Sequence, residues 1–384
     1  MSKVDISPEI RFYEFNENLE VKKLCEVSTY SNGGSYENDV QNKGKYELIT
    51  LKSINMSGNL VCSGKYINIK APTLSKDTLV MILSEQSPGL LGMTALIPSA
   101  KKYVLNQRVA EIKPFQNVDS YFLSMAINKN QVYFSKRGAG TKVQNISKGN
   151  VENYEFYSPS LPEQQKIGTY FKQIDQLITL KQKKHTKLLN LKKAMLNKMF
   201  PQNGATTPEI RFKGFEGEWE EKSLGEIAKI TTGSSNREDS GLTGKYTFFD
   251  RSDDIRTSDI YLFDCEAVIV AGEGSDFIPK YFIGKFDLHQ RTYAIINKPH
   301  YDGRFLFYFI HLFRAWFFNQ AVGSTVKSLR LPMFQEMPIT LPAIIEQQKI
   351  GNYFKKLDQL ISLQEKEITK LQHIKKALLE KMFV

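Results

Sequence analysis

The sequence predicts an α+β protein in which two similar globular domains, in a pseudo-twofold arrangement, are separated by an antiparallel coiled coil of two long helices. Three observations carry this prediction. Residues 163–200 and 346–383 are identical at 25 of 38 positions, so the chain contains an internal repeat. Both stretches lack proline and are rich in Leu, Lys and Gln, which favour helix. The segments before them mix short β-like runs with single helices.

The repeat also covers the start of each half. Pro-Glu-Ile-Arg-Phe at 8–12 returns at 208–212, an offset of 200. Gln107 and Gln290 differ by only 183, and that offset persists to the end of the long helices, so the first half holds 17 more residues inside the same frame. The repeated segments at the ends of each half enclose interiors whose sequences differ. This indicates that the repeated frame is architectural and that each interior carries its own specificity.

We expect five segments along the chain, with a linker marked by two prolines, a glycine and small polar residues. The segments are a first globular domain with its N-terminal framework at 1–160, a first long helix at 161–200, the linker at 201–208, a second globular domain at 209–343 and a second long helix at 344–384. Within the domains, β-like runs at 46–51, 79–83, 267–271 and 292–296 accompany helices at 121–128 and 305–318.

Apolar residues in both long stretches recur at heptad spacing, the pattern of a coiled-coil seam. The seam residues are Ile167, Ile174, Leu188 and Met195 with Tyr170, Leu177 and Leu191, and then Ile350, Leu357, Leu371 and Leu378 with Tyr353, Leu360 and Ile374. Polar residues interrupt each seam at its middle. Only antiparallel pairing puts midpoint on midpoint, so we expect Lys184 to contact Glu367. At 1.5 Å per residue, roughly 36 residues form a rod of about 54 Å, with one domain near each end.

The composition limits the class of protein. The three cysteines are too far apart for a metal site or a disulfide framework, and neither a secretory signal nor a membrane span is apparent, so a cytoplasmic protein is expected. A net charge of +11 indicates an anionic partner. The two repeated stretches hold surpluses of +7 and +3, so the helices touch nucleic acid, or a partner supplies charge, or the lysines form a solvated face.

The motifs of several enzyme classes are missing. We find no phosphate-binding Gly-x-x-x-x-Gly-Lys-Ser/Thr, no His-Glu-x-x-His, no Gly-x-Ser-x-Gly elbow and no Asn/Asp-Pro-Pro-Tyr/Phe motif of amino-methyltransferases. The Gly-x-Gly within residues 271–275 is more typical of a turn than of a cofactor loop. The sequence therefore predicts a chain that performs no catalysis.

Each half closes with Glu-Gln-Gln-Lys-Ile-Gly, at 163–168 and 346–351, followed by a Lys/Leu helix that ends in Lys-Met-Phe. Weaker pieces in the expected order are Trp219, His289-Gln290-Arg291 and Gly323-Ser324-Thr325. This duplicated frame around two unlike segments resembles the specificity subunit of a type I restriction-modification system. The resemblance covers essentially the whole chain.

The resemblance implies a non-catalytic DNA reader. Each globular domain would be a target recognition domain that reads one half of a bipartite site on double-stranded DNA, and the antiparallel helices would set the gap. Two methyltransferase subunits would dock on the repeated helices and methylate adenine with S-adenosylmethionine. Two restriction subunits, with ATP and Mg, would complete the complex. This chain itself would hold no cofactor and no metal.

Polar, glycine-rich loops at equivalent points of the repeat are the candidates for DNA contact, because side-chain hydrogen bonds read base edges and phosphate contacts fix position. The DNA-binding candidates are Asn32, Ser35, Tyr36, Arg137, Thr141 and Lys142 in the first half, and Ser234, Ser235, Asn236, Arg237, Ser324, Thr325 and Lys327 in the second. An ordinary surface turn is the alternative for each of them. Gln107-Arg108 and Gln290-Arg291 fit a framework role or DNA contact equally well.

Aromatic pairs follow each Glu-Gln-Gln-Lys-Ile-Gly motif. The partner-binding candidates are Tyr170, Phe171, Tyr353 and Phe354. Packing in a core or seam is favoured for them, although their place beside two glycines also suits a junction for methyltransferase helices. A different class of function is a duplicated coiled-coil scaffold that joins two protein partners without reading DNA. A stand-alone nuclease or methyltransferase ranks third because its motifs are missing.

Overall fold

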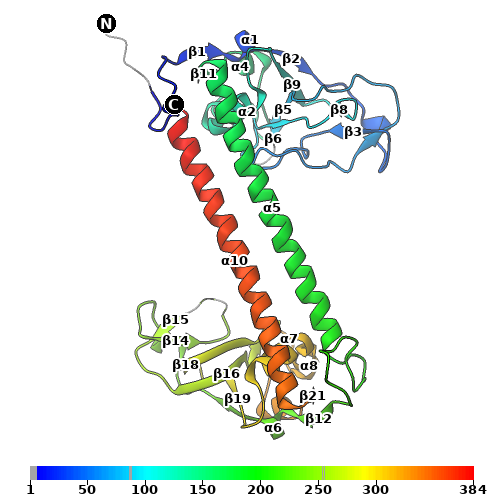
Figure 1. Cartoon of the computed structure of the whole chain (residues 1–384), viewed down its shortest axis with the longest axis vertical. Helices are drawn as coiled ribbons and strands as arrows, with labels where there is room; N and C mark the ends of the chain where they lie inside the picture. The colour runs from blue at the N-terminus through cyan, green and yellow to red at the C-terminus, as the bar shows by residue number, and fades with distance from the viewer. Residues whose placement is uncertain (1–6, 86–88, 253, 255) are drawn as a thin grey trace. The chain divides into compact units, whose positions relative to one another are not determined.

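The computed structural model describes residues 7–85, 89–252, 254 and 256–384. The chain forms two compact units, Met1–Lys181 with Glu367–Val384, and Gln182–Lys366, called here the first and second unit. Both boundaries fall within the long helices α5 (Leu161–Met199) and α10 (Ile344–Met382), green and red in Figure 1. Each unit therefore contains the beginning of one long helix and the end of the other.

The globular part of the first unit combines two small sheets with short helices. An antiparallel sheet has the strand order β2-β9-β5-β7, and a second has the order β4-β3-β8 with β3 and β8 parallel. The strands are β1 (Glu20–Lys23), β2 (Ser28–Asn32), β3 (Tyr46–Ile49), β4 (Tyr66–Ile67), β5 (Leu79–Ile82), β6 (Ser84–Glu85), β7 (Thr94–Leu96), β8 (Tyr103–Leu105), β9 (Val109–Pro114), β10 (Gln144–Asn145) and β11 (Glu155–Ser158). The helices are α1 (Leu24–Val27), η1 (Glu37–Asp39), α2 (Ser120–Lys129), α3 (Gln131–Ser135) and α4 (Lys148–Glu152). β1 pairs with β11, and β6 with β10.

The second unit repeats this plan with a larger sheet. Its six strands run in the order β13-β19-β16-β18-β14-β15, and β14 and β18 are parallel (Figure 1). The strands are β12 (Glu220–Ser223), β13 (Ala228–Thr232), β14 (Tyr246–Phe249), β15 (Arg256–Ser258), β16 (Phe263–Ala271), β17 (Glu273–Gly274), β18 (Lys280–Leu288), β19 (Thr292–Asn297), β20 (Lys327–Ser328) and β21 (Pro338–Leu341). The helices are α6 (Leu224–Ile227), η2 (Arg237–Asp239), α7 (Gly303–Phe313), α8 (Ala315–Gln320) and α9 (Leu331–Gln335). The α+β prediction is confirmed.

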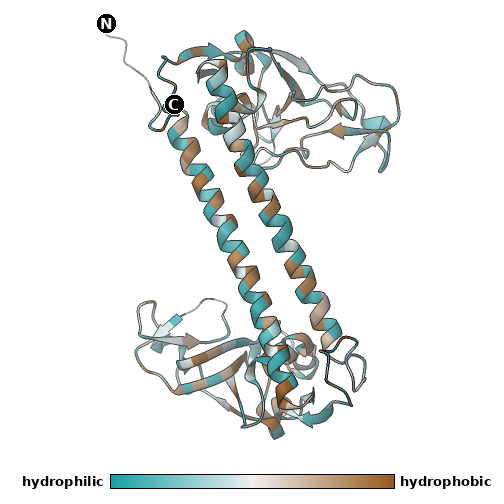
Figure 2. Ribbon diagram, in the orientation of Figure 1, coloured by the Kyte–Doolittle hydropathy of each residue, from teal (hydrophilic) through white to brown (hydrophobic). Residues whose placement is uncertain are grey.

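Alternation of side chains along the central strands builds the cores. In β5, Leu79 and Met81 pack with α2, whereas Val80 and Ile82 pack into a separate cluster on the other face of the sheet. All four are buried, which is why this strand reads as a continuous apolar run. Figure 2 shows the contrast with α5 and α10, which are mostly hydrophilic with recurring hydrophobic positions.

The glutamines of the Glu-Gln-Gln motifs tie each long helix to the helix beside it. The side chain of Asp119 caps α2, and its backbone N–H donates to Oε1 of Gln164 over 3.0 Å. Asp302 caps α7 in the same way, and its N–H donates to Oε1 of Gln347 over 3.0 Å. The capped N-terminus of one helix thus rests on the first turn of the other, and both copies of the repeat encode this contact.

The repeated glycines allow this approach. A Cβ at Gly168 would lie 2.4 Å from Oδ1 of Asp119, and at Gly351 it would lie 2.6 Å from Oδ1 of Asp302. Replacing Gly168 with alanine should therefore lower the free energy of unfolding by about 1–3 kcal/mol, the usual cost of overpacking. Gly149→Ala in α4, where a Cβ would meet no atom within 4 Å, is the matched control and should be neutral or slightly stabilising. Equal thermal midpoints for the two variants would contradict the expectation.

An arginine and a glutamate join the start of each frame to its long helix. Arg11 donates from Nε and Nη2 to both carboxylate oxygens of Glu163, at 2.8 and 2.7 Å. Arg211 makes the same two-point contact with Glu346, at 2.7 and 2.8 Å. Both glutamates are buried, so the Pro-Glu-Ile-Arg-Phe and Glu-Gln-Gln motifs recur together because each supplies half of a buried ion pair.

Within each unit, segments of α5 and α10 pair in antiparallel directions. In the first unit Lys375 contacts Asp175 over 2.6 Å, and in the second Lys192 contacts Asp358 over 2.5 Å. These two ion pairs are equivalent in the repeat. Glu367, expected opposite Lys184, instead pairs with Lys181 over 2.7 Å. Lys181 lies about one helical turn from Lys184, while the two repeated ion pairs keep the antiparallel register within one residue of the midpoint rule.

The Lys-Met-Phe motifs end the long helices in aromatic cores. In the first unit the ring of Phe383 stacks on Phe122 with centroids 5.2 Å apart, next to Phe171. In the second unit Phe200 packs against Phe305 at 5.3 Å and Phe354 at 6.0 Å. Each unit is completed by the terminal phenylalanine of the helix that begins in the other unit's sequence.

Candidate nucleic-acid interface

In the second unit, the loop after β13 meets the turn between β18 and β19. The backbone N–H of Gln290 donates to the carbonyl of Ser235 over 2.9 Å, and Nε2 of Gln290 donates to Oδ1 of Asn236 over 2.6 Å. Asn236 and Arg237 are exposed, as is Ser234. Ser235 is buried and donates from Oγ to Asp287 over 2.8 Å, so its proposed role in DNA contact is corrected to support of the loop.

These segments enclose a hollow of about 310 Å³ with a cationic wall. It is lined by Arg237, Asp250, Arg251, Glu273, His289, Gln290, Arg291 and Thr292. Two carboxylates hold the guanidinium groups in place. Asp250 contacts Arg237 over 3.1 Å, while Glu273 contacts Arg291 over 2.7 Å and Arg251 over 3.9 Å. The sequence singled out Arg237 and Arg291 but missed the two acids and Arg251.

The ionisation of this hollow follows from burial and the neighbouring groups. Burial opposes ionisation of Asp250, but two hydrogen bonds from Ser252 and the charge of Arg237 outweigh it, so the pKa of Asp250 lies below its usual value. Burial lowers the pKa of His289 and outweighs the opposing charge of Asp250, while Arg291 lowers it further. His289 is therefore neutral near pH 7, and its Nδ1 accepts the backbone N–H of Arg291 over 3.0 Å.

The second candidate loop lies beside the same hollow. β17 pairs with β20, which places Gly274 opposite Lys327 and Glu273 opposite Ser328. Ser324 and Thr325 are exposed in the turn before β20. Glu273 pairs with Ser328 and with Arg291, and Gln290 beside Arg291 holds the loop at 232–237, so the two loops chosen from the sequence lie on either side of this turn.

The first unit holds a related loop built around a different side chain. Glu37 accepts hydrogen bonds from Ser35 over 2.8 Å, from Gln107 over 2.5 Å and from Asn106 over 3.3 Å. The hydrogen bond from Ser35 is the largest of the effects that lower the pKa of Glu37 to about 2. Gln107 in the first unit and Gln290 in the second therefore both hold their loop, which supports the framework role for these glutamines.

The remaining candidates of the first unit divide into exposed and packed side chains. Asn32, Thr141 and Lys142 are exposed, and Asn32 accepts a hydrogen bond from Tyr30 over 2.6 Å. Tyr36 is half-buried and packs against the cluster of Leu48, Ile67 and Val104, so it is partly a core residue. The guanidinium of Arg137 is exposed and lies 3.7 Å from the ring centroid of Tyr133, a cation–π contact that fixes its direction.

Both units use the same backbone bonds to bring their two loops together. In the first unit, Leu83 donates to the carbonyl of Arg108 over 3.0 Å and accepts from Ile146 over 3.0 Å. In the second, Gly272 donates to the carbonyl of Arg291 over 2.8 Å and accepts from Leu329 over 2.7 Å. The frame is shared, but Arg237 corresponds to Glu37 and Arg251 to Leu51 at the 200-residue offset. The two loop clusters are therefore chemically different.

Two of the partner-binding candidates lie in the cores. Phe171 and Phe354 are 0% exposed, so the packing role is the observed one and they offer no surface to a partner. Tyr170 and Tyr353 lie at the surface edge, each packed edge-on against a framework phenylalanine, Phe12 or Phe212.

Other side chains on the long helices are exposed and apolar. Leu177 and Leu180 on α5 are 40% and 64% exposed, and the equivalent Leu360 and Leu363 on α10 are 46% and 51% exposed. We call these the leucine pairs. The heptad pattern placed Leu177 and Leu360 in the seam, and in the structure both remain partly exposed, as do the seam residues Leu191 and Ile374, each 40% exposed.

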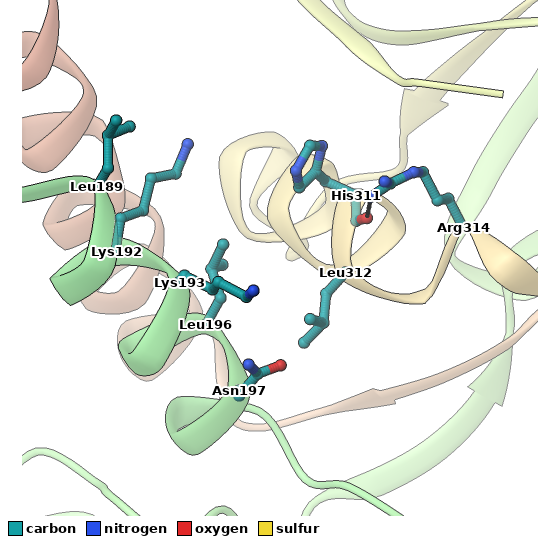
Figure 3. A pocket seen from close by; sticks show the side chains of 8 residues that line it. All are labelled: Leu189, Lys192, Lys193, Leu196, Asn197, His311, Leu312 and Arg314. Atoms are coloured by element: carbon teal, nitrogen blue, oxygen red, sulfur yellow. Dashed lines mark hydrogen bonds between the residues drawn. The ribbon is translucent and has the colours of Figure 1, made fainter. Parts of the chain in front are cut away.

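A second hollow, of about 360 Å³, lies between the end of α5 and the end of α7 (Figure 3). Its walls include Lys192, Lys193, His311 and Arg314 with three leucines, one of them Leu189. At the 183-residue offset, Leu189 corresponds to Gln372 and Arg314 to Gln131, so the lining of this hollow is not repeated. A surface that binds the same partner in both units should occur twice. The leucine pairs occur twice, whereas this hollow does not.

The described residues contain neither a cluster of His, Cys, Asp and Glu suited to a metal ion nor a helix able to span a membrane. What the geometry defines is a protein with two polar, partly cationic loop clusters on one duplicated frame. The family of type I restriction modification DNA specificity domains matches this chain twice, over residues 16–190 and 216–373. The chain belongs to this family.

Individual relatives agree with the family. The chain is 31% identical over 157 residues to the type I restriction enzyme EcoDI specificity subunit of Escherichia coli, an alignment that spans 41% of this chain and about a third, 34%, of that protein. It is 24% identical over 322 residues to the MjaVIII specificity subunit of Methanocaldococcus jannaschii, covering 73% of each. Among solved structures, the S subunit of a type I restriction-modification system from M. genitalium has a TM-score of 0.71, with 16% identity over 99% of both chains. This likeness shows the same fold.

Proposed function

We propose that this chain is the non-catalytic, sequence-specific DNA-binding subunit of a type I restriction-modification complex. Each recognition domain reads one half of a bipartite site on double-stranded DNA, and the long helices set the spacing between the halves. The observation that carries the proposal is the repeated frame with two chemically different loop clusters. A frame that is kept while the loops change is suited to reading two different half-sites.

Methyltransferase subunits dock, in this proposal, on the leucine pairs. Exposed apolar side chains at equivalent positions suit two copies of one apolar partner surface. In the second unit, Leu363 also lines a groove of about 830 Å³ with Tyr281, Ile283 and Phe307, wide enough to receive a partner's apolar side chains. The cofactors belong to the partners: S-adenosylmethionine to two methyltransferase subunits, and ATP with Mg to two restriction subunits.

The proposal is tested by mapping modified bases in genomic DNA from cells that carry this chain with its methyltransferase, against cells that lack only this chain. Loss of methyladenine at one split motif is the expected result, and the motif would give both half-sites and their spacer. A confirmed complex with no difference in methylation would reject DNA reading and favour the scaffold function.

The lysines of the candidate loops give a separate prediction for the affinity of the assembled complex for DNA. Lys142→Ala and Lys327→Ala should each weaken DNA binding by the assembled complex and reduce the slope of log affinity against log salt by about 1, because each releases one phosphate contact. Lys213→Ala, which removes an exposed lysine just after the second Pro-Glu-Ile-Arg-Phe motif, is the control and should leave the slope unchanged. Titrations at several salt concentrations measure the slope, and unchanged slopes for the loop variants would remove both lysines from the interface.

A further inference from the structure

The hollow of the second unit presents guanidinium groups that are held in place. Arg291 is fixed at its backbone, since its N–H donates to His289 and its carbonyl accepts from Gly272. Its side chain is mostly exposed but is held at one end, where Nη1 donates to Oε1 of Glu273 over 2.7 Å. Glu273 is four-fifths buried, so the carboxylate is a rigid anchor.

Two further guanidinium groups lie beside these carboxylates. Arg251 approaches the other oxygen of Glu273 at 3.9 Å, and Arg237 contacts the buried Asp250 at 3.1 Å. Both arginines remain more than half exposed. The two acids offset the repulsion between three cations around one hollow. They accept hydrogen bonds from Arg237 and Arg291, whereas Arg251 at 3.9 Å is an ion-pair neighbour beyond hydrogen-bond distance.

A guanidinium fork with its direction fixed is the side chain best suited to guanine, because it can donate two hydrogen bonds to O6 and N7 in the major groove. A guanidinium can also bind a phosphate bidentately, but a phosphate contact does not require a fork held in one direction, since lysine binds phosphate as a point charge. The anchored arrangement therefore favours base reading over phosphate binding.

We propose that the second recognition domain reads guanine through Arg291, with Glu273 as the positioning residue and Arg251 as a second fork on the same carboxylate. This inference rests on the proposed function and names the base for one half-site. The first unit differs: Arg108, the counterpart of Arg291, forms no ion pair among the described residues, and Glu37 stands where the second unit has Arg237.

The test compares Arg291→Lys, Arg291→Gln and Glu273→Gln in the assembled methyltransferase complex, with methylation of a library of half-site sequences as the readout. Loss of a bidentate contact costs about tenfold to a hundredfold in discrimination. We expect Arg291→Gln to relax one guanine position by that factor, in the half-site read by the second unit and nowhere else, and Arg291→Lys to relax the same position by less, because lysine can also donate to O6 and N7 but has no rigid fork. Glu273→Gln should relax the same position by a smaller factor.

Controls separate the possible failures. Arg108→Lys, the matched substitution in the first unit, should leave the second half-site unchanged. Thermal unfolding and complex formation exclude misfolding of each variant. If Arg291→Lys methylates the native motif with unchanged discrimination while Arg291→Gln weakens all sequences alike, Arg291 binds phosphate and this inference is rejected although the proposed function stands. If the native chain does not direct methylation to any split motif, the proposed function itself is rejected, independently of the role of Arg291.

Discussion

Replacing Arg211 with alanine is expected to lower the free energy of unfolding by about 3–5 kcal/mol, because the carboxylate of Glu346 would remain buried without its partner. The carboxylate is 1% exposed and accepts two hydrogen bonds from this one side chain. Equilibrium unfolding by denaturant measures the change. We expect the same direction for Arg11→Ala, which leaves Glu163 buried in the first unit.

Two further variants separate the cost of a buried unpaired charge from the cost of losing an exposed ion pair. Arg211→Ala combined with Glu346→Gln removes the unpaired charge and should recover part of the lost stability, since a buried neutral amide is less costly than a buried carboxylate. Lys198→Ala, which breaks an exposed contact with Glu209 in the same unit, should cost at most about 1 kcal/mol. A change below that limit for Arg211→Ala would show that the buried pair is not a major source of stability.

Replacing Leu177 and Leu180 together with aspartate is expected to remove one methyltransferase subunit from the complex and leave the other bound. Burial of each leucine at an interface contributes about 1.5–3 kcal/mol, and an aspartate in its place adds the cost of a buried charge, so affinity should fall at least about a hundredfold. The mass of the assembled complex measures the number of subunits bound. The double change at Leu360 and Leu363 should remove the other copy.

The control for docking is Leu189→Asp. Leu189 is also an exposed leucine of α5, at 43%, but its counterpart on α10 is Gln372, so it is not part of a repeated surface. It should leave the number of bound subunits at two. Retention of both subunits by the Leu177 and Leu180 variant, with the fold intact by circular dichroism, would place the docking surface elsewhere.

The repeated framework segments were predictable because the same motifs, with the same spacing, occur in both halves of the chain. Helix-forming composition and heptad spacing gave the two long helices, and the duplicated Glu-Gln-Gln-Lys-Ile-Gly motif marked a shared structural element. Periodicity alone could not decide which apolar positions face inward. Leu177 and Leu360 have the spacing of a seam, but the same spacing also serves an exposed stripe that another protein covers.

The binding site was only partly predictable for a different reason. Arg237, Asp250, Glu273 and Arg291 come from four separate segments, which the strand order β13-β19-β16-β18-β14 brings to one end of a sheet. Nothing in the sequence near Glu273 indicates an arginine partner. The recurrence of Gln-Arg at 107–108 and 290–291 was the available signal, and it identified the turn that lies against the hollow.

The helices that begin in one unit and end in the other impose an order on biosynthesis. The core of the first unit includes Phe383, so Phe122 and Phe171 remain without this aromatic partner until the ribosome has made more than 200 further residues. In many proteins the N-terminal domain finishes folding while the rest is still being translated. The first unit of this chain cannot complete its core in that order. The second unit, Gln182–Lys366, is continuous in sequence and can be complete first, so the last turn of α10 completes a unit whose other residues are made before the second unit.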